Sequence, residues 1–271
     1  MAFITTSDGV ALHYNDWGSG KAVVLIHGWP LDADMWEYQS VRLAEAGYRV
    51  ITYDRRGFGR SAQPWTGYDY DILALDLGRI LESLAISDAT LVGFSMGGGE
   101  VARYMTIAAG GRVAKTVFVA SVAPYLLKTA DNPNGVDQTL FTHVIAGLRA
   151  DRPDFLSGFA EQFYGVGLLT SPVSQPMLDW TAQMALLASP RATIECVKTF
   201  STTDLRKDVA AITTPTLILH GSADKIVPPA LSENLHALIP GAHLKIYEGA
   251  PHGLIVTNAD QLLADLKAFI G

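Results

Sequence analysis

Ser95 stands where a strand-like run of residues passes directly into a helix-like one. Residues 89–94 are mainly apolar and β-type, and they lead into Gly93-Phe94-Ser95-Met96-Gly97. A serine on such a tight strand-to-helix turn is held in a strained backbone conformation, with its hydroxyl at the rim of a sheet. Glycine is expected at 93 and 97 because side chains there would clash. The alternative is an ordinary glycine-rich turn, so the segments on either side must decide.

Strand-like and helix-like segments alternate along most of the chain, which predicts an α/β fold with a mainly parallel sheet covered on both faces. Residues 22–26 are continuously apolar, as expected of a strand buried on both faces. Residues 1–20 are interpreted as two short strands and turns, and the alternating polarity of 11–16 predicts a half-exposed edge strand. The other predicted strands are 48–53, 113–120, 216–220 and 243–247, and the predicted helices are 36–46, 72–84, 97–109, 230–239 and 259–270.

Residues 122–204 interrupt this alternation. Their apolar residues follow helical spacing, with proline and glycine interruptions and no convincing strand. Short helices are predicted at 141–148, 155–163, 177–187 and 192–200. The pattern therefore predicts an α/β core made of residues 1–121 and 205–271, with a helical insertion between them.

Composition excludes several classes of partner. The net charge is −7, and the 20 lysines and arginines are scattered, so no nucleic-acid partner is expected. No apolar run approaches the roughly 20 residues that cross a membrane, and no signal peptide is recognised, so a cytoplasmic protein without a membrane partner is expected. The single cysteine, Cys196, cannot form an internal disulfide and is expected to be a small buried hydrophobic residue.

A serine hydroxyl is a poor nucleophile until a base takes its proton, and that base is normally a histidine held by a carboxylate. His252 lies in a loop with Gly249, Pro251 and Gly253, between the last predicted strand and the last predicted helix. This position lets a histidine reach over the sheet, although an ordinary surface loop histidine is the alternative. The other histidines after Ser95 are less suitably placed, and His220, at a strand end, is expected to pack structurally.

The carboxylate is expected after the preceding strand, because this fold orders its residues as Ser, then Asp or Glu, then His. Asp224 follows the strand at 216–220 by a short turn. An aspartate that hydrogen-bonds its own turn is the competing interpretation. Asp54 and Asp204 are alternative acids, but neither lies between Ser95 and His252 at the expected strand end.

Acyl transfer passes through an oxyanion that usually meets two backbone N–H donors. The N–H of Met96, at the start of a helix, is the first candidate. Trp29, in the loop after residues 22–26, is the second, because Pro30 has no N–H and restricts Trp29 to extended angles. A merely rigid turn at Trp29-Pro30 is the alternative. The predicted pocket walls, for which plain core packing is the alternative, are Trp29, Pro30, Phe159, Phe163 and Ile226.

Together these motifs resemble the α/β-hydrolase superfamily, most closely its branch of aryl esterases and cofactor-free (non-haem) haloperoxidases or perhydrolases. The resemblance covers essentially the whole chain. It is carried by HGWPLDADMWEYQ (27–39), YDRRGFGRS (53–61), LVGFSMGGGEVARY (91–104), HGSADKIVP (220–228) and APHGL (250–254).

The resemblance implies the α/β-hydrolase fold, with a mostly parallel eight-stranded sheet, helices on both faces and a helical cap at 122–204. It implies Ser95, Asp224 and His252 as catalytic triad and the amides of Trp29 and Met96 as oxyanion hole. It also implies hydrolysis of short-chain and aryl esters, peracid formation with halide oxidation, no metal or other cofactor, and assembly into a homo-oligomer.

The sequence thus predicts a serine carboxylesterase that acts on a small-molecule ester or carboxylic acid through an acyl-enzyme. Proline at position 30 is the pattern of relatives regarded as haloperoxidases, which implies perhydrolase activity as a side reaction. Perhydrolysis, or lactam or amide hydrolysis, as the main activity remains an alternative, as does a ligand-binding receptor of this fold. Serine at position 95 argues against dehalogenases and epoxide hydrolases, which attack with an aspartate.

Overall fold

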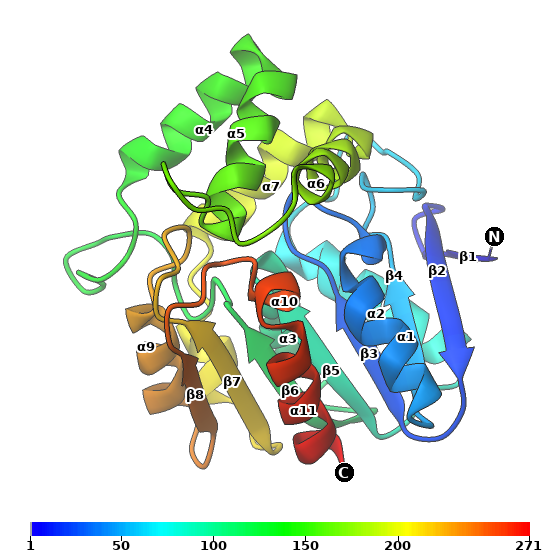
Figure 1. Cartoon of the computed structure of the whole chain (residues 1–271). Coiled ribbons are helices and arrows are strands. Elements are labelled where there is room, and N and C mark those ends of the chain that lie inside the picture. Colours follow the sequence, from blue (N-terminus) through cyan, green and yellow to red (C-terminus); the bar gives the residue numbers. More distant parts are fainter. Residues whose placement is uncertain (1) are drawn as a thin grey trace.

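The computed structural model describes residues 2–271 and shows one central sheet with helices on both faces (Figure 1). The sheet is eight-stranded with the order β1-β2-β4-β3-β5-β6-β7-β8. β2 pairs antiparallel with β1 and with β4, and the other neighbouring pairs are parallel, which confirms the mostly parallel sheet. The strands are β1 (Ala2–Thr5), β2 (Ala11–Gly18), β3 (Ala22–Ile26), β4 (Arg49–Tyr53), β5 (Ala89–Phe94), β6 (Val113–Val119), β7 (Thr216–Gly221) and β8 (His243–Tyr247).

The prediction that residues 11–16 form an edge strand is wrong. β1 takes the edge and pairs with β2, with Ile4 opposite Leu12, while β4 occupies the other side of β2. The alternation of polar and apolar residues reports which face of a strand is buried. It carries no information on whether the backbone groups at the two sides of that strand are paired.

Helices cover both faces of the sheet. α1 contacts α10 and α11, which lie in front of the sheet in Figure 1, whereas α2, α3, α8 and α9 contact one another in series. In α2 the predicted apolar stripe is buried, and Asp69 begins the helix by accepting a hydrogen bond from the Ile72 N–H. The helices outside the inserted region are η1 (Ala33–Trp36), α1 (Glu37–Glu45), α2 (Tyr70–Ser83), α3 (Met96–Ile107), α8 (Arg206–Ala210), α9 (Ala230–Leu238), α10 (Leu254–Thr257) and α11 (Ala259–Ile270).

Four helices of the inserted region lie over the carboxyl ends of the strands, at the top of Figure 1. α4 contacts α5 and α7, and α5 contacts α6, so we call the four helices the cap. They are α4 (Gln138–Ala150), α5 (Arg152–Tyr164), α6 (Gln175–Leu187) and α7 (Pro190–Thr202).

Each cap helix begins before the sequence-based expectation, because apolar spacing does not register a polar first turn. Asp137, Asp151, Ser174 and Ser189 each accept a hydrogen bond from a backbone N–H of the first turn that follows. The divisions of the chain at 121/122 and 204/205 stay predictions.

The strand order determines which loops meet. β3 and β5 are neighbours, so the loop after β3, which carries Trp29, lies beside the turn that carries Ser95. β7 and β8 are also neighbours, and the loops after them carry Asp224 and His252. Because these strands run parallel, all four loops emerge at the same edge of the sheet, beneath the cap (Figure 1).

Candidate active site

Ser95 occupies a sharp turn between β5 and α3. Its backbone has φ 52° and ψ −116°, a left-handed conformation that is costly for a residue with a Cβ. A Cβ added at Gly93 would lie 2.5 Å from the carbonyl oxygen of Gly97, and one at Gly97 would lie 2.7 Å from that of Ile26. The turn therefore requires glycine on both sides of the serine.

The structure brings Ser95, His252 and Asp224 together. The Nε2 atom of His252 lies 3.1 Å from the Ser95 Oγ, and its Nδ1 atom lies 2.6 Å from the Asp224 Oδ2. Since a carboxylate only accepts hydrogen bonds, Nδ1 carries a hydrogen, and in the neutral ring Nε2 is left to accept from the serine hydroxyl. The ring of His252 also packs against Phe94 and Phe163. This arrangement suits a histidine that takes a proton from the serine.

Asp224 uses its two carboxylate oxygens differently. Oδ1 accepts hydrogen bonds from the N–H groups of Ile226 at 2.8 Å and Val227 at 2.9 Å, while Oδ2 faces His252. Burial alone would raise the pKa of this carboxyl, but the nearby His252 and His220 outweigh it and hold the pKa well below its usual range. The turn-forming aspartate and the histidine partner, which competed as interpretations of the sequence, are thus one residue.

The two alternative acids lie elsewhere. Asp54 is 3.2 Å from the Nδ1 of His13 and accepts a hydrogen bond from the Ala33 N–H, so it supports the loop after β3. Asp204 forms an ion pair at 2.6 Å with Arg206 at the surface. Asp224 is therefore the carboxylate that contacts His252.

The two expected oxyanion donors lie on either side of Ser95. Met96 is the first residue of α3, and Trp29 is in the loop after the neighbouring strand β3. Within residues 2–271 neither backbone N–H donates a hydrogen bond to a protein acceptor. The indole of Trp29 donates from Nε1 to the carbonyl oxygen of Thr193 in α7, at 2.9 Å. That contact, which has no signal in the sequence, ties the loop to the cap.

A cavity of about 390 Å³ opens beside Ser95 and His252. Trp29, Phe159 and Ile226 line it, as the sequence predicts. Pro30 and Phe163 do not, because Pro30 is turned into the core and Phe163 is fully buried against Phe94 and His252. The further apolar lining residues are Val122, Leu126, Leu140, Phe141, Val144, Phe155, Phe200 and Val227, and the polar ones are His143, Asp154, Gln162 and Lys225.

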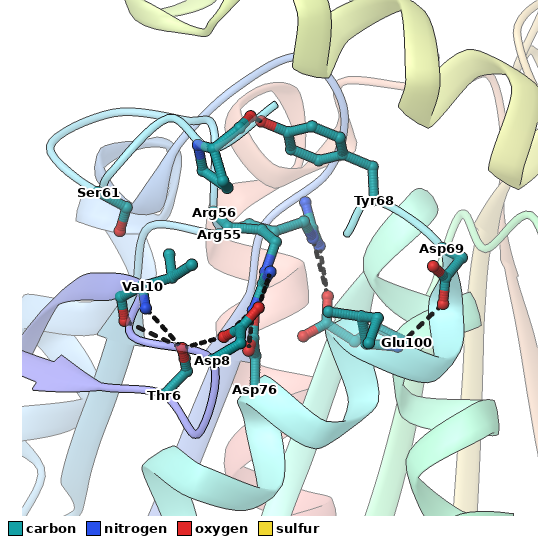
Figure 2. A network of polar contacts seen from close by, with 12 residues as sticks. Thr6, Asp8, Val10, Arg55, Arg56, Ser61, Tyr68, Asp69, Asp76 and Glu100 are labelled. Carbon is teal, nitrogen blue, oxygen red and sulfur yellow. Dashed lines mark hydrogen bonds and ion pairs between the residues drawn. The ribbon is translucent and has the colours of Figure 1, made fainter. Parts of the chain in front are cut away.

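A buried ion pair behind the site was missed by the sequence-based reasoning. Arg55 donates from Nε to Glu100 of α3 at 2.8 Å, and Glu100 also accepts from the hydroxyl of Tyr53 (Figure 2). Arg55 further donates to the carbonyl oxygen of His27 at 2.9 Å, and its backbone N–H donates to the His27 Nε2 at 2.9 Å. Burial, and then the Arg55 charge, lower the pKa of His27 to about 3. The network thus joins the loop before Trp29 to the helix that follows Ser95.

Arg56 makes the second half of this network. Its guanidinium lies 2.6 Å from Asp76 of α2 and 2.8 Å from Asp8, which holds the turn after β1 (Figure 2). Burial, opposed by Arg56, raises the pKa of Asp76 to about 6. The available signal was the arginine pair after a buried strand in YDRRGFGRS, because charged residues enter a core only with partners.

Other chemistry has less support from the described residues. Within residues 2–271 no three His, Cys, Asp or Glu side chains are grouped so as to hold a metal ion. Cys196 is buried in α7, and burial raises the pKa of its thiol to about 12. Among the described helices none has both the length and the apolar character needed to cross a bilayer.

Comparison with known proteins adds the family. A family model described as alpha/beta hydrolase fold matches residues 21–259. A non-heme haloperoxidase from Rhodococcus erythropolis is 42% identical over 272 residues, covering 100% of this chain and 99% of that protein. A bifunctional esterase/perhydrolase from Acinetobacter calcoaceticus is 38% identical over 275 residues, covering 100% of this chain and 99% of that protein. The crystal structure of a bromoperoxidase from Bacillus anthracis matches with a TM-score of 0.96 and 44% identity, over 99% of both chains.

The sequence matches extend over the whole chain, and the structural match includes both the sheet and the cap helices. They agree with the resemblance inferred from the motifs around Ser95, Asp224 and His252. The protein therefore belongs to the α/β-hydrolase family, as an enzyme of the branch that contains non-haem haloperoxidases and esterase/perhydrolases.

Proposed function

We propose that this protein is a serine carboxylesterase that hydrolyses short-chain or aryl esters through an acyl-enzyme. The observation that carries the proposal is the continuous contact from Asp224 through His252 to Ser95, at 2.6 Å and 3.1 Å, beside an apolar cavity of about 390 Å³. Nucleophile, base and the group that orients the base lie within hydrogen-bond reach of one another, which is the arrangement that activates a serine.

In this mechanism the Ser95 oxygen attacks the ester carbonyl carbon while the His252 Nε2 takes the hydroxyl proton. Asp224 holds the Nδ1–H tautomer and stabilises the imidazolium that forms. The backbone N–H groups of Trp29 and Met96 donate to the oxyanion. When the intermediate collapses, His252 returns the proton to the departing alcohol. A water molecule, with His252 again as base, then hydrolyses the acyl-enzyme and restores the serine.

The walls of the cavity support the choice of substrate. Trp29, Phe155, Phe159 and Phe200 present aromatic rings to the space beside Ser95. Such walls favour apolar acyl or aryl groups, and a volume of about 390 Å³ suits small molecules. The homo-oligomer and the cytoplasmic location stay predictions.

The first test compares p-nitrophenyl acetate hydrolysis by the wild type and by Ser95→Ala. We expect the variant to lose roughly 10³-fold or more of kcat, as removal of a triad nucleophile does. Ser40→Ala is the matched control, since Ser40 is equally buried but lies in α1. Activity that survives in Ser95→Ala would remove Ser95 from its role. A wild type that binds esters without turnover would favour a receptor.

Perhydrolysis is a second proposed activity, in which hydrogen peroxide replaces water as the attacker of the acyl-enzyme and releases a peracid that oxidises halide. Pro30 and the names of the haloperoxidase and perhydrolase relatives favour it. We expect peroxide- and acetate-dependent bromination to fall in Pro30→Leu while ester hydrolysis is kept. Equal bromination by the two proteins would argue against the activity.

A further inference from the structure

His220 lies in β7, four residues before the acid, and its side chain is fully buried. Its Nδ1 atom is 2.6 Å from the hydroxyl oxygen of Ser232 in α9. Its Nε2 atom is 3.0 Å from the carbonyl oxygen of Val227 and 3.1 Å from the Oδ2 of Asp224. The expectation that His220 simply packs therefore leaves one contact unexplained, the one with the acid.

The surroundings determine which nitrogen of His220 carries hydrogen. Both neighbours of Nε2, a backbone carbonyl and an ionised carboxylate, can only accept, so Nε2 carries a hydrogen whether the ring is neutral or charged. In the neutral ring Nδ1 is then an acceptor, and the Ser232 hydroxyl is the donor beside it. The N–H of His220 is thus shared between Val227 and Asp224.

We propose that Ser232 and His220 form a second polar chain onto the acid, in which His220 is a positioning residue for Asp224. This inference rests on the proposed esterase function, and it extends the chain to Ser232–His220–Asp224–His252–Ser95. No proton moves through its outer half. His220 supplies a fixed N–H that shares the charge of Oδ2 with His252, and by bonding Val227 it also holds the turn whose N–H groups bind Oδ1.

The consequence is a direct effect on the base. Without the N–H of His220, the charge on Oδ2 of Asp224 faces His252 alone, which stabilises the imidazolium and raises the pKa of His252. Asp224 also loses one of the groups that orient it, so transfer of the serine proton becomes less efficient. A histidine that only joined β7 to α9 would have neither effect.

The titratable groups around this chain come from several elements. Lys225 follows the acid in sequence, and His143 of α4 and Asp154 of α5 line the cavity with His252. All three side chains belong to exposed residues and are left unchanged in the variants below, so they act as a constant background.

The test compares His220→Leu, which removes the donor, with His220→Gln, whose amide keeps one. We expect His220→Leu to raise the pKa of the acid limb of the kcat/KM profile by about half a unit or more. We expect kcat to fall about tenfold with little change in KM, because only positioning is lost. His220→Gln is expected to recover most of both effects. An unchanged acid limb in folded His220→Leu would overturn the proposal.

Ser232→Ala keeps the proposal testable where His220→Leu fails to fold, since it leaves His220 in place and removes only its hydrogen-bond donor. We expect a smaller shift of the acid limb in the same direction. His236→Leu is the control, because this exposed histidine lies on the same helix and away from Asp224. A shift in the control equal to that in Ser232→Ala, or no shift in Ser232→Ala, would count against the chain.

A readout without turnover separates this inference from the proposed function. In the Ser95→Ala background, proton NMR of the His252 Nδ1–H follows the titration of His252 with and without His220→Leu. A shifted titration supports the second chain even where the esterase assignment fails. Loss of hydrolysis in Ser95→Ala together with an unshifted titration would keep the esterase and reject the role of His220.

Discussion

At the scale of single residues, the site depends on side chains whose separate atoms have separate partners. Asp224 binds its own turn with Oδ1 and faces two histidines with Oδ2. His252 faces Asp224 with one nitrogen and Ser95 with the other. A substitution that keeps the shape of such a residue but changes one atom therefore tests function with little effect on the fold.

Asp224→Asn is the clearest change of this kind. The amide oxygen can still accept from Ile226 and Val227, but the amide nitrogen would donate toward His252 and favour the wrong tautomer of its ring. We expect kcat for p-nitrophenyl acetate to fall roughly 10³- to 10⁴-fold, with thermal unfolding little changed. Near-normal turnover in this variant would show that another carboxylate serves His252.

At the scale of elements, the cap and the core meet through the loop after β3. The Trp29 indole donates to Thr193 of α7, and its ring packs against Phe159 of α5 and Phe200 of α7. The same residue has its unpaired backbone N–H beside the elbow. A shift of α7 would therefore move a proposed oxyanion donor.

Trp29→Phe and Trp36→Phe form a matched pair for this coupling. Both tryptophans are buried, but the Nε1 of Trp36 has no hydrogen-bond partner among the described residues. We expect both variants to lose about 1–2 kcal/mol of stability from the smaller ring. Only Trp29→Phe is expected to lower kcat, by about tenfold, because only it frees the loop from the cap. Equal losses of kcat would indicate a general packing effect.

At the scale of the whole molecule, burial separates the carboxyl groups into those that favour and those that oppose folding at neutral pH. Asp32, which is 1% exposed, has its pKa raised to about 7 by burial and then by the negative charge of Asp54. Arg60 forms an ion pair with Asp54 at 2.9 Å but only partly offsets the effect on Asp32. The loop that carries Trp29 therefore holds an aspartate that resists ionisation.

The pH dependence of stability follows from this shift. In the unfolded chain Asp32 ionises near its ordinary pKa of about 4, so between about pH 4 and pH 7 the folded protein binds more protons than the unfolded one. The contribution of Asp32 to stability is thus lost as the pH rises through that range.

Asp32→Asn keeps the acceptor for the Asp34 N–H and removes the titration. Relative to the wild type, we expect it to gain about 2 kcal/mol more in free energy of unfolding at pH 8 than at pH 5. Denaturant unfolding at the two pH values measures the difference. Asp34→Asn, a half-exposed neighbour, is the control and is expected to show little such difference. Parallel behaviour of the two variants would contradict the assignment to Asp32.

The sequence by itself determined the features that depend on local backbone requirements. Glycine at 93 and 97 and a serine between them define the turn, because no other residues fit its close contacts. Alternating strands and helices predicted the sheet, and the order of the loops then indicated Ser95, Asp224 and His252. These features could be predicted because backbone conformation and periodicity are encoded within a few consecutive residues.

Only the tertiary structure decided which distant side chains meet. It placed His220 against Asp224, Arg55 against Glu100 and the Trp29 indole against Thr193, and it turned Phe163 away from the cavity. Each of these contacts joins residues that belong to different elements or turns. Their formation depends on how helices and strands pack, and apolar spacing records only that a residue is buried, not what it is buried against.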